Sequence, residues 1–281
     1  MRVIETISDM KAVIRSNKDL GKTIGLVPTM GYLHEGHLSL MKKSVEGNDF
    51  TVISIFVNPT QFGPNEDFEK YPRDIERDLR LAESVGVDVV FSPSVAEMYP
   101  DNYKTYVAVE DITNVLCGLS RPGHFRGVTT VVNKLFNIVE PNKAYFGQKD
   151  AQQVVVLKKM VRDLNMNLEI VTCPIIRESD GLAMSSRNVY LNKDERLAAL
   201  ILSKSLFEVE EMIKQGEKSR EKVVKYLKDR IKSEKLADID YVEVVSTDGL
   251  GQVEKLEGSI LVALAVRFGK TRLIDNIVVE V

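Results

Sequence analysis

The sequence predicts an α/β protein, with a doubly wound parallel sheet in its first part and a smaller α+β domain at its C-terminus. In the first part, short β-branched runs alternate with stretches of helical spacing, which is typical of a parallel sheet covered by helices on both faces. Beyond residue 192 the pattern changes to helices followed by strands. With 281 residues, the chain is long enough for two domains of ~150 residues each.

The elements of the first part follow from these runs. Strands are expected at 23–29, 51–58, 87–93, 105–109, 143–148 and 168–173. Helices are expected between them, at 36–47, 73–85, 127–139 and 150–164. This alternation predicts a Rossmann-like sheet, in which ligands bind at the carboxyl ends of the strands, where the strand order reverses.

The second part is expected to begin with two helices between Lys193 and about Lys235. One apolar stripe is formed by Leu206, Val209 and Ile213, and another by Val223, Leu227 and Ile231. Strands are expected at 239–246, 259–268 and 271–280, and "GKT" between the last two is a hairpin signal. The aperiodic segment between Cys173 and Asn192 contains the expected boundary, which gives domains 1–175 and 176–281.

Composition excludes several classes of protein. Apolar residues make up 44% of the chain, and the longest apolar runs, at 52–57 and 260–266, fall far short of the ~20 residues that cross a bilayer. The N-terminus carries no secretory signal pattern, so a cytoplasmic protein without membrane contact is expected. Two isolated cysteines argue against a thiolate zinc site, although they could still pair. A net charge of −3 argues against nucleic acid as a partner, but leaves room for a local anion pocket.

The stretch "VPTMGYLHEGHLSLM" places His34 and His37 at a junction between a strand and a helix. Residues three apart lie on one side of a helix, and a first turn offers unpaired N–H groups and the positive end of the dipole. The histidines should resist protonation there and act as hydrogen-bond donors or acid–base groups. Two alternatives stay open: ordinary polar residues at a helix cap, or a pair of metal ligands.

This stretch resembles a known family. "HEGH" is similar to the HIGH signature of the nucleotidyl-transferring α/β superfamily, and "PTMGYLHEGH" resembles the form found in the pantothenate synthetase (pantoate–β-alanine ligase) family. Further motifs match that family in order over nearly the whole chain: "VNPTQF" at 57–62, "RPGHFRG" at 121–127, "FGQKDAQQ" at 146–153 and "MSSRN" at 184–188. The last is similar to the superfamily's KMSKS loop.

The resemblance implies which residues bind ATP. They are Met30, Gly31, Tyr32, Leu33, His34, Glu35, Gly36, His37, Gly147, Gln148, Lys149, Asp150, Ile176, Met184, Ser185, Ser186 and Arg187. Lys149 would bring a compact charge to the triphosphate, and Asp150 could accept from the ribose hydroxyls. Arg187 and the hydroxyls before it can donate several hydrogen bonds to phosphate oxygens. The alternative for "MSSRN" is a cap for the helix that begins at Lys193, but Asn192 can cap that helix.

The resemblance also implies the residues that bind the other substrates: Gln61, Gln153, Asn58 and Arg121. An amide suits a hydroxy acid because it offers both a donor and an acceptor. The alternative for Asn58 is a cap for the turn after Pro59. Arg121 is expected near the pantoate carboxylate, whereas His124 could serve only to order its loop. Residues 64–77 are expected to form a gate over the site, with a plain surface connection as the alternative.

Taken together, the resemblance implies a ligase that couples (R)-pantoate to β-alanine, giving pantothenate, AMP and pyrophosphate through a pantoyl adenylate. The first domain would bind ATP and pantoate, and the second would cover the site. His37, His34, Lys149 and Arg187 are the expected catalytic residues, with Mg²⁺ bridging the triphosphate oxygens, and a homodimer is expected. Three alternatives stay open: a related small-molecule nucleotidyltransferase, a tRNA-charging enzyme, which the length and acidic balance disfavour, and a non-enzymatic nucleotide or metal sensor.

Overall fold

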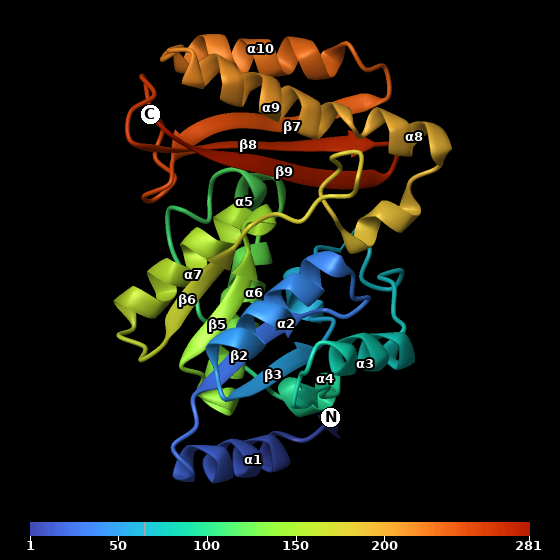
Figure 1. Ribbon diagram of the computed structural model, residues 1–281, viewed down its shortest axis with the longest axis vertical. Helices are drawn as coiled ribbons and strands as arrows, with labels where there is room; N and C mark the ends of the chain where they lie inside the picture. Colours follow the sequence, from blue (N-terminus) through green and yellow to red (C-terminus); the bar gives the residue numbers. More distant parts are fainter. Residues whose placement is uncertain (65) are drawn as a thin grey trace. The chain divides into compact units, whose positions relative to one another are not determined.

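The computed structural model describes residues 1–64 and 66–281. By its internal contacts the chain divides into two compact units (Figure 1). Unit 1 comprises Met1–Glu110, Arg121–Gly147 and Val156–Pro174. Unit 2 comprises Asp111–Ser120, Gln148–Val155 and Ile175–Val281. Two short segments, 111–120 and 148–155, therefore join the C-terminal part of the chain although they lie within its first two thirds.

Unit 1 contains a parallel sheet, as the sequence predicted. Within the described residues it has six strands in the order β1-β4-β3-β2-β5-β6. Their bounds are Arg2–Ile4 (β1), Ile24–Thr29 (β2), Phe50–Ile55 (β3), Val89–Phe91 (β4), Lys143–Gly147 (β5) and Glu169–Cys173 (β6). Each pair of neighbouring strands is parallel. The order reverses between β2 and β5, so their carboxyl ends form the edge at which such sheets bind ligands.

Both faces of this sheet are covered. Its helices are α1 (Ile7–Asp19), α2 (Glu35–Gly47), α3 (Ile75–Ser84), α4 (Val95–Met98), α6 (His124–Val139) and the C-terminal part of α7 (Ala151–Asp163). Val27 of β2 packs with Met41 of α2 and Ala82 of α3 in one buried cluster. Leu26, the next residue back, points to the opposite face and is also fully buried. Because α6 contacts β2 and α1, the continuous apolar run in β2 lies between two layers of helices.

One predicted strand is wrong. Residues 105–109 form no strand, and the backbone of Val107 is satisfied by side chains of α6 instead. The hydroxyl of Thr129 donates to the carbonyl of Val107 at 2.7 Å, and the hydroxyl of Thr130 accepts from its amide at 3.0 Å. The two threonine hydroxyls thus form the hydrogen bonds to the Val107 backbone that a neighbouring strand would otherwise form. The sequence analysis also did not predict β1 and α1.

Unit 2 contains a three-stranded antiparallel sheet within the described residues, in the order β7-β8-β9. Its strands are Ala237–Ser246 (β7), Ser259–Phe268 (β8) and Thr271–Glu280 (β9), close to the predicted ranges. Its helices are α8 (Lys193–Ala198), α9 (Ile201–Lys214) and α10 (Arg220–Lys232). Both predicted apolar stripes, on α9 and α10, are buried against one face of the sheet. The prediction of two helices missed α8, which Asn192 caps with Glu195 in a capping box.

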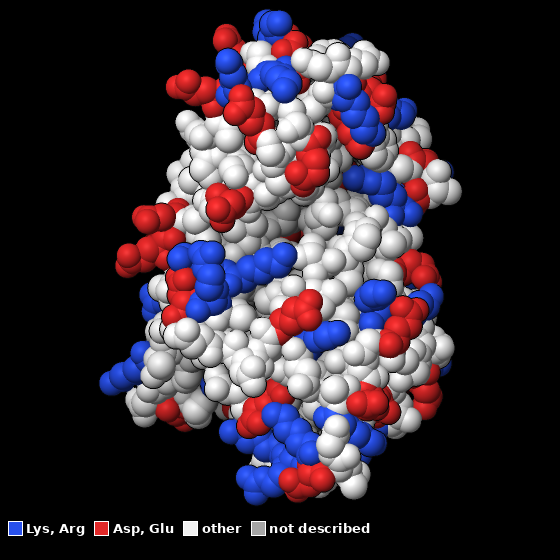
Figure 2. All heavy atoms as spheres, turned by 60° about the vertical axis from the view of Figure 1, so that its left-hand side comes forward, with Lys and Arg blue, Asp and Glu red and all other residues white. Residues whose placement is uncertain are grey.

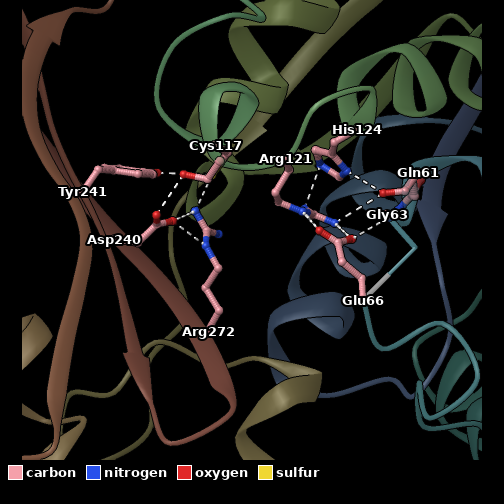
Figure 3. A network of polar contacts seen from close by, with 10 residues as sticks. Gln61, Gly63, Glu66, Cys117, Arg121, His124, Asp240, Tyr241 and Arg272 are labelled. Carbon is pink, nitrogen blue, oxygen red and sulfur yellow. Dashed lines mark hydrogen bonds and ion pairs between the residues drawn. The ribbon is translucent and has the colours of Figure 1, made fainter.

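The second face of this sheet is covered by the two inserted segments. Leu116, Ile112, Ala151 and Val155 pack against side chains of β7 and β8. The short helix α5 (Cys117–Ser120) lies here, and Cys117 contacts the hydroxyl of Tyr241 at 3.2 Å (Figure 3). Both cysteines of the chain, Cys117 and Cys173, are buried and free, so they do not pair.

The surface is mixed in charge. Figure 2 shows acidic and basic side chains interspersed over the face that it displays, in keeping with the net charge of −3. No helix within residues 1–64 and 66–281 combines the length and the apolar character that crossing a bilayer requires.

Candidate active site

The loop between β2 and α2 is held by a buried carboxylate. Asp78 of α3 accepts hydrogen bonds from the backbone N–H groups of Tyr32 at 2.6 Å and Leu33 at 2.7 Å. It is 1% exposed, and burial raises its pKa although the two N–H bonds and Arg77 oppose the rise. Gly31 has a φ of +80°, and a Cβ there would lie 2.9 Å from the Asp78 carboxylate. The loop therefore requires glycine at 31 and a small acidic side chain at 78.

The loop delivers both histidines to the first turn of α2, as predicted. His34 is the N-cap residue, and its backbone N–H donates to Nδ1 of His37 at 3.3 Å. The ring centroids lie 4.0 Å apart. Since Nδ1 of His37 accepts this bond, a neutral His37 carries its proton on Nε2. Two imidazoles thus stand beside the N–H groups at the positive end of the α2 dipole, an arrangement that favours anions.

Asn58 and Gln61 lie at the 3-10 turn η1 (Pro59–Gln61), after the carboxyl end of β3. Oδ1 of Asn58 accepts from the hydroxyls of Thr60 at 3.0 Å and Tyr99 at 2.8 Å. Burial raises the pKa of Tyr99 to about 12, so its phenol stays protonated and donates. Asn58 is 1% exposed and caps the turn, as its alternative interpretation expected.

Gln61 connects this turn to the loop after β2. Its Oε1 accepts from Nδ2 of Asn58 at 3.1 Å, and its Nε2 lies 3.0 Å from the sulfur of Met30. The turn packs tightly on α6, because a Cβ at Gly127 would lie 2.2 Å from the carbonyl oxygen of Thr60. The second glycine of "RPGHFRG" is therefore required by this close approach.

Arg121 is engaged in a polar network (Figure 3). Its guanidinium donates to both carboxylate oxygens of Glu66 at 2.6 Å, and Nη2 donates to the carbonyl of Gln61 at 3.3 Å. His124 completes the network: Nε2 lies 3.0 Å from Nη1 of Arg121, and Nδ1 lies 2.8 Å from the carbonyl of Gln61. Arginine has no acceptor, so Nε2 of His124 accepts and Nδ1 donates. His124 thereby orders its loop.

Charge pairing sets the ionisation of Glu66. Burial opposes its charged form, but the hydrogen bonds and charge of Arg121, helped by the backbone N–H of Gly63, outweigh burial and lower its pKa to about 2. The bidentate geometry is the one in which arginine binds carboxylates most strongly. Arg121 is thus oriented to bind a carboxylate in bidentate fashion, and the carboxylate that it binds is that of Glu66.

The remaining predicted ATP-binding residues, apart from Gly147 at the end of β5, belong to unit 2. Gln148, Lys149 and Asp150 form the 3-10 turn η2 (Gln148–Asp150), with Nζ of Lys149 at 4.0 Å from a carboxylate oxygen of Asp150. The carbonyls of Gln148 and Lys149 each accept from Nδ2 of Asn276, in β9, at 3.0 Å. Gln153 follows on the first turn of α7.

The second segment of unit 2 is a small hairpin. Arg177 and Ala183 form an antiparallel bridge, and the N–H of Met184 donates to the carbonyl of Ile176 at 3.0 Å, which brings Ile176 and Met184 together. Ser185 caps the 3-10 helix η3 (Ser186–Tyr190) by accepting from the N–H of Arg187 at 3.3 Å. The "MSSRN" motif therefore makes a turn of its own and does not cap α8.

The sequence analysis missed the residues that hold these segments. Asp78, Glu66, Asp275 and Asn276 were not among the candidates. A polar residue on the buried face of an amphipathic helix was the available signal for Asp78, since it falls one turn before the buried Ala82. For Asp275 and Asn276 the signal was a polar pair between two apolar runs of one strand, Leu273–Ile274 and Ile277–Val279.

The fold and the junction define the class of protein. A doubly wound parallel sheet, with two adjacent histidines at the first turn of the helix that follows a central strand, has the arrangement expected of the HIGH-motif α/β enzymes. The family model for pantoate-beta-alanine ligase matches residues 2–278. The chain belongs to the pantoate-beta-alanine ligase family and is an ATP-dependent ligase.

Curated relatives match over the full chain. It is 73% identical to a pantothenate synthetase of Acetivibrio thermocellus over 281 residues, with 100% of both chains covered. It is 60% identical to one from Caldicellulosiruptor saccharolyticus, again over 100% of both chains. Among solved structures, pantothenate synthetase from Thermus thermophilus matches with a TM-score of 0.94 and 42% identity over 99% of each chain.

A further solved structure includes ligands. Pantoate-beta-alanine ligase from Francisella tularensis, complexed with beta-gamma ATP and beta-alanine, matches with a TM-score of 0.79 and 37% identity. The match covers 99% of this chain and 97% of that one.

Replacing Asp78 by asparagine should loosen the loop that carries the histidines. Each oxygen of the Asp78 carboxylate accepts from one backbone N–H group, whereas asparagine has only one acceptor oxygen. One of the two buried N–H groups would therefore lose its hydrogen bond. We expect the free energy of unfolding to fall by about 1–3 kcal/mol, measured by urea denaturation. Glu76→Gln, an exposed change on the same helix, is the control and should shift it by less than about 0.5 kcal/mol. Equal stabilities for the two variants would contradict this role of Asp78.

The ion pair of Glu66 should leave a signature in acid. A carboxylate whose pKa is lower in the folded than in the unfolded chain stabilises the fold at pH values above the unfolded-state pKa. This contribution is lost as the pH falls toward the folded-state pKa. The wild-type free energy of unfolding should therefore fall more steeply than that of Glu66→Gln between pH 4.5 and about 2. Denaturation at a series of pH values measures the two slopes, with exposed Glu69→Gln as the control that should follow the wild type. Parallel curves for wild type and Glu66→Gln would refute the pairing.

Proposed function

We propose that the protein condenses (R)-pantoate with β-alanine in a reaction driven by ATP, giving pantothenate, AMP and pyrophosphate. The whole-length match to the pantoate-beta-alanine ligase family supports this reaction. The Francisella tularensis relative, solved with beta-gamma ATP and beta-alanine, supports two of the three substrates.

The observation that carries the proposal is the pair of histidines at the start of α2. Their rings stand 4.0 Å apart beside the first-turn N–H groups, at the carboxyl end of the central strand β2. In the proposed role, His34 and His37 donate hydrogen bonds to phosphate oxygens, and His37 does so through Nε2. Preorganised donors of this kind stabilise charge as it builds up in a transition state.

The reaction needs activation because a carboxylate does not react usefully with an amine at neutral pH. In the first step a carboxylate oxygen of pantoate attacks the α-phosphorus, the bond to the β-phosphate oxygen breaks, and pyrophosphate leaves. In the second step the neutral amine of β-alanine attacks the acyl carbon and loses one proton, the bond from the acyl carbon to the phosphate oxygen breaks, and AMP leaves. The protein forms no covalent bond, so its contribution is positioning and electrostatic stabilisation.

The triphosphate would be bound by Lys149 and Arg187, in addition to the histidines. Gly147, Gln148, Asp150 and the residues Ile176, Met184, Ser185 and Ser186 complete the proposed nucleotide site, together with the loop from Met30 to Gly36. The turn capped by Ser185 supports a phosphate-binding role, because the capping hydroxyl holds the backbone of Arg187.

Pantoate would be bound by Gln61, Gln153 and Arg121. Asn58 supports Gln61 through the bond from Nδ2 to Oε1, so we assign Asn58 an indirect share in this site. Arg121 would exchange Glu66 for the pantoate carboxylate, since the bidentate geometry suits both groups.

The segment 64–77 would serve as the gate. Phe62 packs edge-on against Phe68 at 5.4 Å and against Tyr71 at 6.0 Å between ring centroids, so two aromatic side chains of the segment contact the residue that follows η1. Residue 65, within the proposed gate, lies outside the described residues.

Mg²⁺ would arrive with the triphosphate. Within residues 1–64 and 66–281 no group of three or more His, Cys, Asp or Glu side chains is placed to hold a metal. Mg²⁺ commonly binds through substrate phosphates and waters, with few protein ligands. We further propose that the protein is a cytoplasmic homodimer. Light scattering would test this by measuring the mass of the particle in solution.

The decisive experiment follows AMP with labelled ATP and pantoate, with and without β-alanine. We expect rapid AMP release only when β-alanine is present. A nucleotidyltransferase would instead keep the nucleotide on its product, and a sensor would bind ATP without turnover. Either result would refute the proposed reaction.

Loss of one phosphate donor should reduce turnover and leave the fold intact. Removing such a donor typically costs about 2.7–4 kcal/mol of transition-state stabilisation, so His37→Ala and Lys149→Ala should each lose two to three orders of magnitude in kcat. Lys158→Ala, an exposed change on α7, is the control and should keep wild-type turnover. Near-normal AMP release by either test variant would overturn the role assigned to that residue.

A further inference from the structure

We propose that Asn276 and Asp275, adjacent residues of β9, are positioning residues that fix both phosphate-binding segments of unit 2 to the C-terminal sheet. The segments are 148–150 and 176–187. The inference rests on the proposed function, because it assumes that these segments bind the triphosphate. Neither residue would touch the substrate.

Asn276 holds the segment that carries Lys149. Its Nδ2 donates to the carbonyls of Gln148 and Lys149, both at 3.0 Å, and its Oδ1 lies 3.4 Å from Nε2 of Gln148. It is 3% exposed, so water does not satisfy these groups. Both backbone carbonyls at the base of the Lys149 side chain thus depend on one amide.

Asp275 holds the second segment. Its two carboxylate oxygens accept from the guanidinium of Arg177, at 2.6 and 2.9 Å, in a bidentate pair. Arg177 also donates to the carbonyl of Gly181 at 3.1 Å, and it forms the bridge with Ala183 that closes the hairpin before "MSSRN". The same carboxylate accepts from the backbone N–H of Asn276 at 2.8 Å, so the two anchors are joined.

The period of a β-strand explains why two neighbours can hold two different segments. Successive side chains point to opposite faces of a sheet. Leu273 and Ile277 belong to the cluster on the face that α9 and α10 cover, so Asp275 points to that face as well. Asn276 points to the opposite face, where η2 begins. One strand therefore holds one segment on each of its faces.

The chemistry of the pair argues for placement rather than for stability alone. Burying a carboxylate and an amide costs free energy that apolar side chains in a strand would not cost, even when the polar groups are paired. Their hydrogen bonds end on the backbone of the Lys149 turn and on the hairpin that leads to Arg187. Small displacements of such groups would weaken binding of the triphosphate, because hydrogen bonds and charge pairs depend on geometry.

The test compares Asn276→Leu with wild type. Leucine has nearly the same shape as asparagine without its donors, so loss of packing is minimised. We expect binding of a nonhydrolysable ATP analogue, measured by calorimetry, to weaken about tenfold, and KM for ATP to rise by a similar factor. KM for β-alanine should stay at the wild-type value. Asp275→Asn, which loses the charge that holds Arg177, should show the same split.

The control is Ile277→Val, a neighbouring core change on β9 that removes a methylene and breaks none of the hydrogen bonds to either segment. This control separates the effect of lost stability from the effect of lost positioning. Even if its melting temperature falls as far as that of Asn276→Leu, its affinity for the ATP analogue should equal that of the wild type. If Asn276→Leu does not fold, Asn276→Ser, which keeps one donor, is measured in the same way with a smaller expected loss.

The outcomes decide two separate claims, the positioning role and the proposed function. Unchanged analogue affinity and ATP KM in the folded Asn276 variant would overturn the positioning role, and so would an equal loss in Ile277→Val. A parallel rise in KM for β-alanine would show a general structural effect and would also overturn it. A wild-type protein that neither binds the analogue nor releases AMP would overturn the proposed function itself.

Discussion

The buried carboxylate of Asp78 is the constraint on which the geometry of unit 1 depends. It binds two consecutive backbone N–H groups in the loop after β2 and so determines where the chain turns into α2. Because the helix begins at Glu35, His34 becomes its N-cap and His37 its third residue. Without a Cβ at Gly31 the loop can pass directly over the carboxylate. A charge buried in one helix therefore sets the position of two imidazoles on another.

Much of this architecture can be predicted from periodicity. The β-branched runs locate β2, β3, β5 and β6, and the stripes on α9 and α10 identify the faces that become buried. Periodicity fails where side chains replace a partner strand, as at Val107. It also says nothing about which distant polar group a buried carboxylate will meet. Asp275 therefore stands out in the sequence only as a polar residue beside apolar runs, and Asp78 only by its place on the buried face of a helix.

The candidate site shows the same limit. Its motifs predict that His34 and His37 come together, which the ring distance confirms. They do not predict that Asn58 directs its hydrogen bonds to the turn around it, nor that Arg121 is already paired. Motif residues are recognised by type and spacing, whereas their bonding partners come from segments far apart in the sequence. Contacts between such segments arise only in the folded chain.

In the role proposed for Arg121, its pairing with Glu66 would make the chain its own competitive inhibitor. A tethered carboxylate is present at a high effective concentration, so an incoming acid must displace it before the guanidinium can accept a new partner. In that role, the apparent affinity for any acid would be its intrinsic affinity multiplied by the fraction of time that the internal pair is open. An acid that makes few other contacts would not regain the binding free energy that is lost in displacing Glu66. Because this factor is the same for every acid, it would leave the order of preference unchanged, and only acids that make further contacts would still bind at low concentration.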